Sequence, residues 1–209
     1  QRAIRTAARN IRAVASRQVP RAWTISPTPG LHITQRGTPL DRVGCYVPGG
    51  RYPLPSSLLM TAIPAVTAGV GEVFAVCPRP DPTVMFAALE AGVTGLFRIG
   101  GAHAVAALAY GTESIPRVDK IVGPGNAYVA AAKAQVASDC AIDFFAGPSE
   151  IAVVSSTGNP SWIAADLIAQ AEHDPDARAI LITPVMSLAL AVTKEIERQL
   201  PATGPAAAA

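Results

Sequence analysis

A polar face on one predicted helix is the strongest candidate for chemistry in this 209-residue sequence. The periodicity predicts a helix over residues 161–173, and at about 100° per residue Asp166, Gln170 and His173 lie within roughly 60° of one another. A pair spaced i, i+3 that ends in His suits two ligands of one metal ion, because imidazole supplies a nitrogen donor. A second interpretation stays open, in which His173 interacts with the helix dipole beside a solvated Gln170.

Four turns rich in Gly and Pro follow predicted strands and form a second candidate site. They are Pro48-Gly49-Gly50, Gly100-Gly101, Gly123-Pro124-Gly125-Asn126 and Gly147-Pro148-Ser149-Glu150. In open α/β sheets, ligands bind beyond the carboxyl ends of the strands, where Gly permits close approach and helix N-termini offer free N–H groups. Together the turns predict one ligand cleft, although each turn alone also fits a helix cap or a positive φ.

The usual dinucleotide fingerprint is absent from these turns. The third glycine of G-x-G-x-x-G stands at the sixth position, where the run that begins at Gly123 has Tyr128. Spacing alone therefore does not identify a dehydrogenase.

The other nucleophilic and imidazole side chains carry weaker signals. His103 begins the helix after Gly100-Gly101, where a side chain can contact a ligand, whereas His32 alternates with strand residues and is interpreted as exposed or structural. Ser149 lacks a G-x-S-x-G elbow and is interpreted as a hydrogen-bonding residue, not a nucleophile. For Cys45, a small buried thiol is favoured over a ligand contact.

The elements that position these residues alternate between helix and strand. Residues 2–17 have helical periodicity, and short strands over 31–34 and 42–47 are predicted to form a hairpin around 36–39. Further helices are expected at 57–69, 82–91, 102–110, 126–138, 161–173 and 186–200, and strands at 72–77, 95–98, 118–122, 141–145, 151–156 and 178–183. Strands that are apolar on both faces are typical of buried parallel sheets, so we predict an α/β fold with a doubly wound, mostly parallel sheet.

Composition excludes several classes of protein. Half of the residues are hydrophobic and 15% are charged, which excludes a disordered chain, and the apolar stretches are too short to span a membrane. The net charge is +2, yet residues 1–40 hold seven Arg and no acidic residue. The arginines at 2, 5, 9 and 12 fit a nucleic-acid stripe, a transit peptide or a solvated helix face. We favour the solvated face and expect no nucleic-acid partner.

The cysteines indicate a reducing compartment. Cys45, Cys77 and Cys140 are odd in number and far apart, without a C-x-x-C pair. The N-terminus also lacks the apolar core of a signal peptide. We therefore expect free thiols and a cytoplasmic protein.

Several long motifs, in this order, resemble the histidinol dehydrogenase family. They are Gly44-Cys45-Tyr46-Val47-Pro48-Gly49-Gly50, Gly100-Gly101-Ala102-His103-Ala104 through Gly111-Thr112-Glu113-Ser114, Val118-Asp119-Lys120-Ile121-Val122-Gly123-Pro124-Gly125-Asn126, Ala146-Gly147-Pro148-Ser149-Glu150 and Gln170-Ala171-Glu172-His173. The resemblance covers nearly the whole chain, from about residue 8 to 200.

The resemblance implies a homodimeric, zinc-containing enzyme that uses two NAD molecules in succession to oxidise L-histidinol through an aldehyde to L-histidine. Its domains are incomplete Rossmann-like folds. Matched by motif, Tyr46 and Asn126 would contact NAD, as would His103, where the family usually has Gln. Ser149 would contact the substrate. The zinc ligands, which also face the substrate, would be Gln170 and His173.

The resemblance also implies a domain plan in which the chain is the amino-terminal half of the enzyme. Residues 1–22 would be a helix of the second domain, 23–148 the NAD-contacting domain, 149–200 a partial substrate and zinc domain, and 201–209 a low-complexity tail. Family members are roughly twice as long, and their Glu-His acid–base pair and remaining zinc ligands lie beyond this chain. We therefore expect no catalytic residue in the chain and no turnover by it alone.

Two other functions stay open on the sequence. A related NAD- and zinc-dependent dehydrogenase could act on another small alcohol, such as a sulfonate alcohol. Alternatively, a non-catalytic nucleotide-binding module could keep the cleft without the chemistry.

Overall fold

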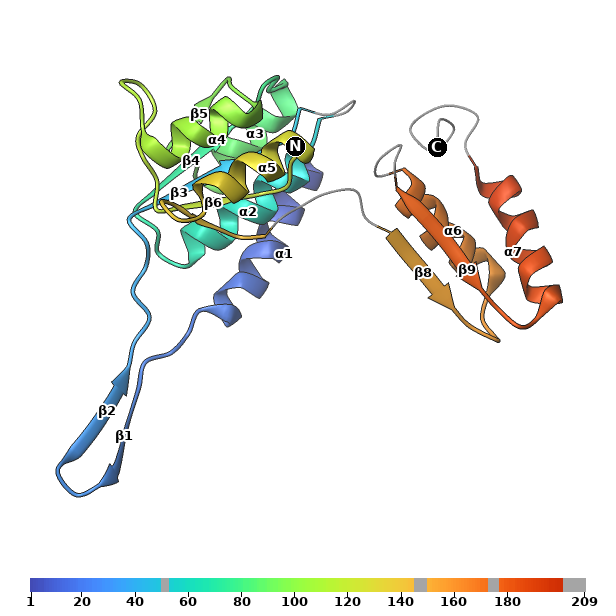
Figure 1. Cartoon of the computed structure of the whole chain (residues 1–209), viewed down its shortest axis with the longest axis horizontal. Helices are drawn as coiled ribbons and strands as arrows, with labels where there is room; N and C mark the ends of the chain where they lie inside the picture. Colours follow the sequence, from blue (N-terminus) through green and yellow to red (C-terminus); the bar gives the residue numbers. More distant parts are fainter. Residues whose placement is uncertain (50–52, 145–149, 173–176, 201–209) are drawn as a thin grey trace. The chain divides into compact units, whose positions relative to one another are not determined.

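The chain folds into two compact units, each with its own hydrophobic core (Figure 1). The computed structural model describes residues 1–49, 53–144, 150–172 and 177–200. Unit 1 is Gln1–Gly147 and unit 2 is Pro148–Ala209. Among the described residues, no helix combines the length and apolarity needed to cross a membrane.

Unit 1 is built on a five-stranded parallel sheet with the strand order β5-β4-β3-β6-β7. Its strands are β3 (Arg42–Tyr46), β4 (Glu72–Val76), β5 (Gly95–Phe97), β6 (Lys120–Val122) and β7 (Ala141–Ile142), and its intervening helices are α2 (Pro55–Thr67), α3 (Pro82–Ala91), α4 (Gly101–Tyr110) and α5 (Ala127–Val136). The chain runs outward from β3 to β4 and β5, then passes back across the sheet to β6 and β7. The strand order therefore reverses between β3 and β6, which confirms the predicted doubly wound α/β class.

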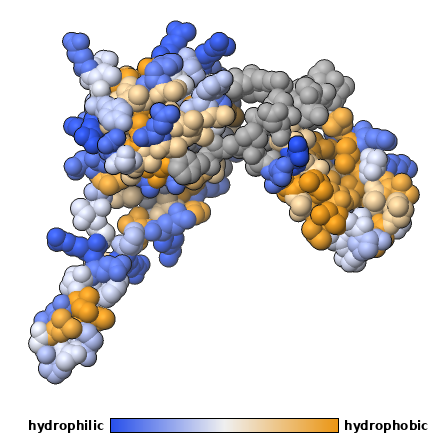
Figure 2. Space-filling model, in the orientation of Figure 1, coloured by the Kyte–Doolittle hydropathy of each residue, from blue (hydrophilic) through white to orange (hydrophobic). Residues whose placement is uncertain are grey.

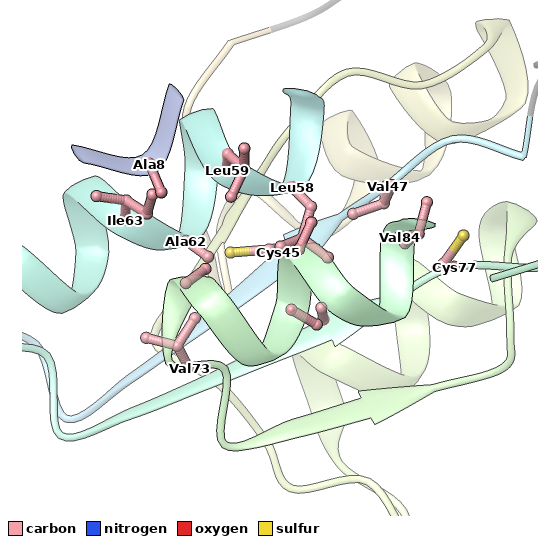
Figure 3. Packing of buried hydrophobic residues seen from close by; sticks show 14 of the residues in the cluster. Ala8, Cys45, Val47, Leu58, Leu59, Ala62, Ile63, Val73, Cys77 and Val84 are labelled. Carbon is pink, nitrogen blue, oxygen red and sulfur yellow. The ribbon is translucent and has the colours of Figure 1, made fainter. Parts of the chain in front are cut away.

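Helices cover both faces of this sheet because the strands present apolar side chains alternately to each side. Val43, Cys45 and Val47 pack in one buried cluster with residues of α2 and α3, as Figure 3 shows. Tyr46 belongs to a second buried cluster, which includes residues of α4 and α5. Successive residues of β3 thus join opposite layers, so the core fixes the direction in which each side chain of this strand points.

A β-hairpin precedes the sheet, but its strands are not the predicted ones. β1 (Trp23–Thr28) pairs antiparallel with β2 (Leu31–Gln35), and Thr28 lies opposite Leu31 across the turn. The predicted pairing of 31–34 with 42–47 is wrong, because the latter segment joins the parallel sheet as β3. The chain reverses where Gly30 supplies a φ of +84°, a conformation that glycine adopts at no steric cost.

The hairpin has one polar and one apolar face, and both are exposed. On the polar face, Ser26 Oγ lies 2.7 Å from His32 Nδ1, and Thr24 bonds Thr34 through their hydroxyls. His32 therefore has the exposed, structural role that the strand pattern predicts. The apolar face carries Trp23, Ile25, Leu31 and Ile33, all exposed. Figure 2 shows hydrophobic surface on the hairpin.

The first helix, α1 (Arg2–Gln18), lies in unit 1. It buries Ala8 and Ala15 and packs against α2 and α3. In this chain α1 is therefore part of the same compact unit as the parallel sheet. The physical reason is that the small, apolar stripe of α1 fits the outer surface of the α2–α3 layer.

The arginine stripe of α1 is a largely solvated face with two attachment points. Arg5 Nε lies 3.3 Å from a carboxylate oxygen of Glu90, and its guanidinium lies 5.5 Å from the centre of the Phe86 ring. Arg12 donates a 3.4 Å hydrogen bond to the carbonyl oxygen of Glu90. The stripe therefore contributes to the attachment of α1 to α3.

Unit 2 contains two βα repeats. β8 (Glu150–Val154) pairs in parallel with β9 (Arg178–Ile182), and α6 (Pro160–Ala171) and α7 (Met186–Gln199) follow the two strands. Buried residues of both helices form its core, against which alternate strand residues pack. The other strand face carries exposed apolar side chains, namely Val154, Ile180 and Ile182.

Candidate cofactor site

The candidate site lies at the carboxyl edge of the parallel sheet in unit 1, where the strand order reverses. At such a switch point, neighbouring strands send their connections to opposite faces and leave a crevice. Here the flanking strands are β3 and β6. Three of the predicted glycine turns follow β3, β5 and β6 at this edge; Gly50 and the turn at 147–150, apart from Glu150, lie outside the described residues.

Tyr46, the last residue of β3, connects this edge to the start of α4. Its hydroxyl oxygen accepts a 2.9 Å hydrogen bond from the backbone N–H of Gly101, so the phenol takes the place of a side-chain cap on that helix. Burial raises the pKa of Tyr46, and donation from Gly101 lowers it by a smaller amount. The phenol is therefore neutral near pH 7, and its O–H proton can be donated to a ligand.

His103 lies in the first turn of α4, beside the same contact. Its imidazole approaches Gly101 so closely that a Cβ built on that glycine would lie 3.3 Å from the ring's Cε1. The side chain is exposed. Tyr46 of β3 and His103 of α4 therefore both lie next to Gly101, although the two elements are far apart in sequence.

Gly123, directly after β6, forms the closest backbone approach at the site. A Cβ built on Gly123 would lie 2.2 Å from the carbonyl oxygen of Tyr46, and φ is +112°. Only glycine accommodates both the contact and the dihedral angle. The turns after β3 and β6 thus touch through backbone atoms.

Asn126 ends the same turn and begins α5. Its Oδ1 accepts a 3.1 Å hydrogen bond from the N–H of Val129, which caps the helix. The cap uses the oxygen, so the amide nitrogen with its two donors is the part that can bind a ligand. Free N–H groups of the first turn and the helix dipole favour an anion at this position.

The glycines after β3 and β5 are also held by tight packing. A Cβ on Gly49 would lie 2.4 Å from Pro78, and one on Gly100 would lie 2.8 Å from the same ring. Pro78 follows β4, between the two turns. The turns after β3 and β5 therefore pack closely at this edge of the sheet. In open α/β sheets, ligands with phosphate groups bind at such an edge.

One cavity of unit 1 lies away from these residues. A cavity of about 580 Å³ is bordered by α2, β6 and the segment after β2, with Met60, Pro64 and Val122 among its lining residues. Tyr46, His103 and Asn126 do not line it. Of the three residues, His103 and Asn126 are exposed and Tyr46 is buried.

Two of the predicted metal and substrate residues lie outside the described residues. These are Ser149 and His173. Gln170 lies in the last turn of α6 in unit 2 and is half-buried. Within the described part of the chain, no group of three His, Cys, Asp or Glu side chains is placed to hold a metal ion. Gln170 alone is too small a donor set for a tetrahedral zinc ion, which takes about four ligands.

The cysteines are free and buried, as expected. Cys45 lies on the face of β3 opposite to Tyr46, and burial raises the pKa of its thiol to about 12. The interpretation of Cys45 as a small buried thiol is therefore confirmed.

Sequence reasoning missed Lys133 and Asp143, which hold the turn after β6. Lys133 is 1% exposed in an alanine-rich helix and pairs with Asp143. A lone Lys among small apolar residues of a predicted buried helix is the signal that was available, because a buried charge requires a partner.

An open, mostly parallel sheet with helices on both faces and a reversal of strand order defines a doubly wound α/β protein. The comparisons with known proteins specify the family. The histidinol dehydrogenase family model matches residues 1–209, and the chain belongs to this family.

Curated relatives share about half of their sequence with the chain over the matched region. Histidinol dehydrogenase of Methylococcus capsulatus is 55% identical over 205 residues, which cover 96% of this chain and 47% of the relative. The Geobacillus kaustophilus enzyme is 54% identical over 203 residues, or 94% of this chain and 48% of the relative. The chain thus spans about half the length of these relatives.

A solved structure has the same fold. The crystal structure of histidinol dehydrogenase from Elizabethkingia anophelis superposes with a TM-score of 0.92 at 36% identity, over 99% of this chain and 49% of that one. The fold class and the family resemblance are therefore both confirmed.

Proposed function

We propose that this chain carries the NAD-binding edge of a histidinol dehydrogenase, an enzyme that oxidises L-histidinol to L-histidine through the aldehyde. The observation that carries the proposal is that Tyr46, at the end of β3, bonds Gly101 at the start of α4 and touches Gly123 before the start of α5, the two helices that carry His103 and Asn126. We infer the reaction from the family to which the chain belongs. We infer NAD binding, the part assigned to these residues, from their positions. NAD, when bound, accepts the hydride.

Each of the three residues makes a different contact with the dinucleotide. The N-terminus of α5 favours the pyrophosphate, and the Asn126 amide nitrogen donates beside it. The Tyr46 hydroxyl, whose oxygen is occupied by Gly101, donates its proton to a ligand oxygen. His103 borders the site from the first turn of α4 and contributes an exposed imidazole that can contact the ligand.

The zinc and substrate contacts are a further part of the proposal. Gln170 and His173 would be zinc ligands that also face the substrate, and Ser149 would contact the substrate. Because these donors are too few for a complete site, the remaining ligands and the acid–base pair must come from residues outside this chain. The chain alone is then inactive, and the complete enzyme is a cytoplasmic homodimer.

Calorimetric titration of the chain with NAD tests the binding proposal. Saturable binding of one NAD per chain is expected, with no NADH formed when histidinol and zinc are added. Tyr46→Phe should weaken binding about tenfold, because a ligand hydrogen bond and the α4 contact are lost together.

The matched control is Tyr110→Phe. The Tyr110 hydroxyl also makes a single hydrogen bond, 3.0 Å to Asp139, but at the other end of α4. This variant should bind NAD like the wild type. Absence of saturable NAD binding, or equal losses in both variants, would contradict the proposal.

A further inference from the structure

One buried ion pair holds both polar groups of the glycine at the switch point. Asp143 Oδ2 accepts a 2.7 Å hydrogen bond from the N–H of Gly123, and Lys133 Nζ donates a 3.1 Å bond to the carbonyl oxygen of the same glycine. Lys133 and Asp143 also bond each other. The pair therefore fixes Gly123 from both sides.

Further contacts hold the pair itself. Asp143 Oδ1 accepts a 2.7 Å bond from the N–H of Phe144, and the Lys133 ammonium lies 5.5 Å from the centre of the Phe144 ring. The Lys133 side chain is 1% exposed and that of Asp143 is 17% exposed. Such a pair is costly to desolvate, and well-packed apolar residues of similar volume often stabilise a fold equally well. Stability alone therefore gives a weak reason for placing these charges here.

The location of Lys133 and Asp143 beside Gly123 gives a better reason for the two buried charges. Gly123 has a φ of +112° and faces the Tyr46 carbonyl, and Asn126 begins α5 three residues later. A glycine has the greatest conformational freedom of any residue, so the turn needs outside contacts to hold one geometry. Charge-assisted bonds to both the N–H and the carbonyl oxygen supply that constraint.

We infer that Lys133 and Asp143 are positioning residues for NAD binding: they hold the Gly123–Asn126 turn in the geometry that presents the α5 N-terminus and the Asn126 amide. The inference rests on the proposed function for its ligand. Neither residue needs to touch NAD, since both act through the backbone of Gly123.

The first test needs no ligand. Amide hydrogen exchange, measured by NMR on the wild-type chain and on Lys133→Met with Asp143→Ala, reports the Gly123 N–H directly. Loss of charge-assisted bonds should accelerate exchange at Gly123 about ten- to hundredfold, while Ile121 in β6 keeps its protection. Unchanged exchange at Gly123 overturns the inference, whatever the chain binds.

The second test separates positioning from stability by titration with NAD. Lys133→Met alone leaves a carboxylate without its cation and should lower the Tm; the double variant removes that charge, so the Tm should recover in part. NAD affinity should stay at least about tenfold weaker in both variants. If affinity returns with the Tm in the double variant, the pair is merely structural and the inference fails.

Two further variants complete the comparison. Val136→Ala removes buried volume from the same helix without touching the turn, so it should lower the Tm and keep the NAD affinity. Lys133→Arg keeps the charge and the donors and should retain the wild-type affinity. The wild-type chain could bind no NAD while hydrogen exchange at Gly123 still accelerates in the double variant. That result would refute the proposed function but leave the role of the ion pair in the turn intact.

Discussion

Replacement of Gly123 by alanine is the sharpest perturbation of the proposed site. The new Cβ would lie 2.2 Å from the Tyr46 carbonyl oxygen, whereas carbon and oxygen normally approach to about 3.3 Å. One backbone must therefore move by about 1 Å. Overpacking of this kind costs about 1–3 kcal/mol, and the left-handed φ of +112° adds about 1–2 kcal/mol for a residue with a Cβ. We expect Gly123→Ala to lose about 2–5 kcal/mol of unfolding free energy in total.

Gly92→Ala is the matched control, because it isolates the second of these two costs. Gly92 ends α3 with a φ of +81°, and a Cβ built on it would meet no atom within 4 Å. This variant should lose only about 1–2 kcal/mol. Urea unfolding followed by circular dichroism gives both values, and calorimetric titration gives the NAD affinity, which should fall only for Gly123→Ala. Equal destabilisation of the two variants would refute the reasoning, since the Tyr46 contact would then carry no energy.

Three further predictions concern single residues of the described structure. Asn126→Ser keeps a capping oxygen and Asn126→Ala removes it, so only the alanine variant should lose about 1 kcal/mol of unfolding free energy in urea. Both variants lack the amide nitrogen, so calorimetry should show weaker NAD binding for both. His103→Gln should leave the Tm unchanged, because the imidazole is exposed, while calorimetry should show an NAD affinity different from that of the wild type. Cys45, whose pKa is about 12, should resist thiol reagents until the chain unfolds. Because the pKa of this thiol is higher in the folded than in the unfolded chain, its contribution to stability should be intact below about pH 9 and should decline as the pH rises toward 12. A spectrophotometric thiol assay with and without urea checks the first part, and alkaline unfolding of wild type against Cys45→Ala checks the second.

Local signals were sufficient to predict most of the elements. The predicted helix over 82–91 has those bounds in the structure, since Asp81 accepts a 2.8 Å bond from Val84, Pro82 begins the helix and Gly92 ends it in a left-handed conformation. These three residue types act through contacts within a few positions of the chain. The alternation of helices with apolar strands was likewise sufficient for the fold class.

Long-range pairing was not predictable in the same way. The segment 42–47 has a strand pattern that fits a hairpin as well as a parallel sheet, and only the cluster of α2, α3 and β4 around Val43 and Cys45 decides between them. The predicted strand over 141–145 is reduced to Ala141–Ile142 in the structure; the N–H of Asp143 still makes a 3.3 Å bond to the Ile121 carbonyl oxygen, and the Asp143 carboxylate bonds Gly123. Both differences arise from partners that lie far away in sequence.

The proposed NAD site lacks the usual glycine fingerprint, and the glycines after β6 have other contacts in the structure. The second glycine of the fingerprint allows close approach of backbone, and the third allows close packing of the helix. Here Gly123 lies against the Tyr46 carbonyl oxygen, and a Cβ on Gly125 would lie 2.3 Å from Val129 in the first turn of α5, so contacts within the protein require glycine at both positions. Tyr128, at the position of the missing third glycine, is 77% exposed. We attribute the fixed geometry of this turn to the ion pair of Lys133 and Asp143, which bonds both polar groups of Gly123.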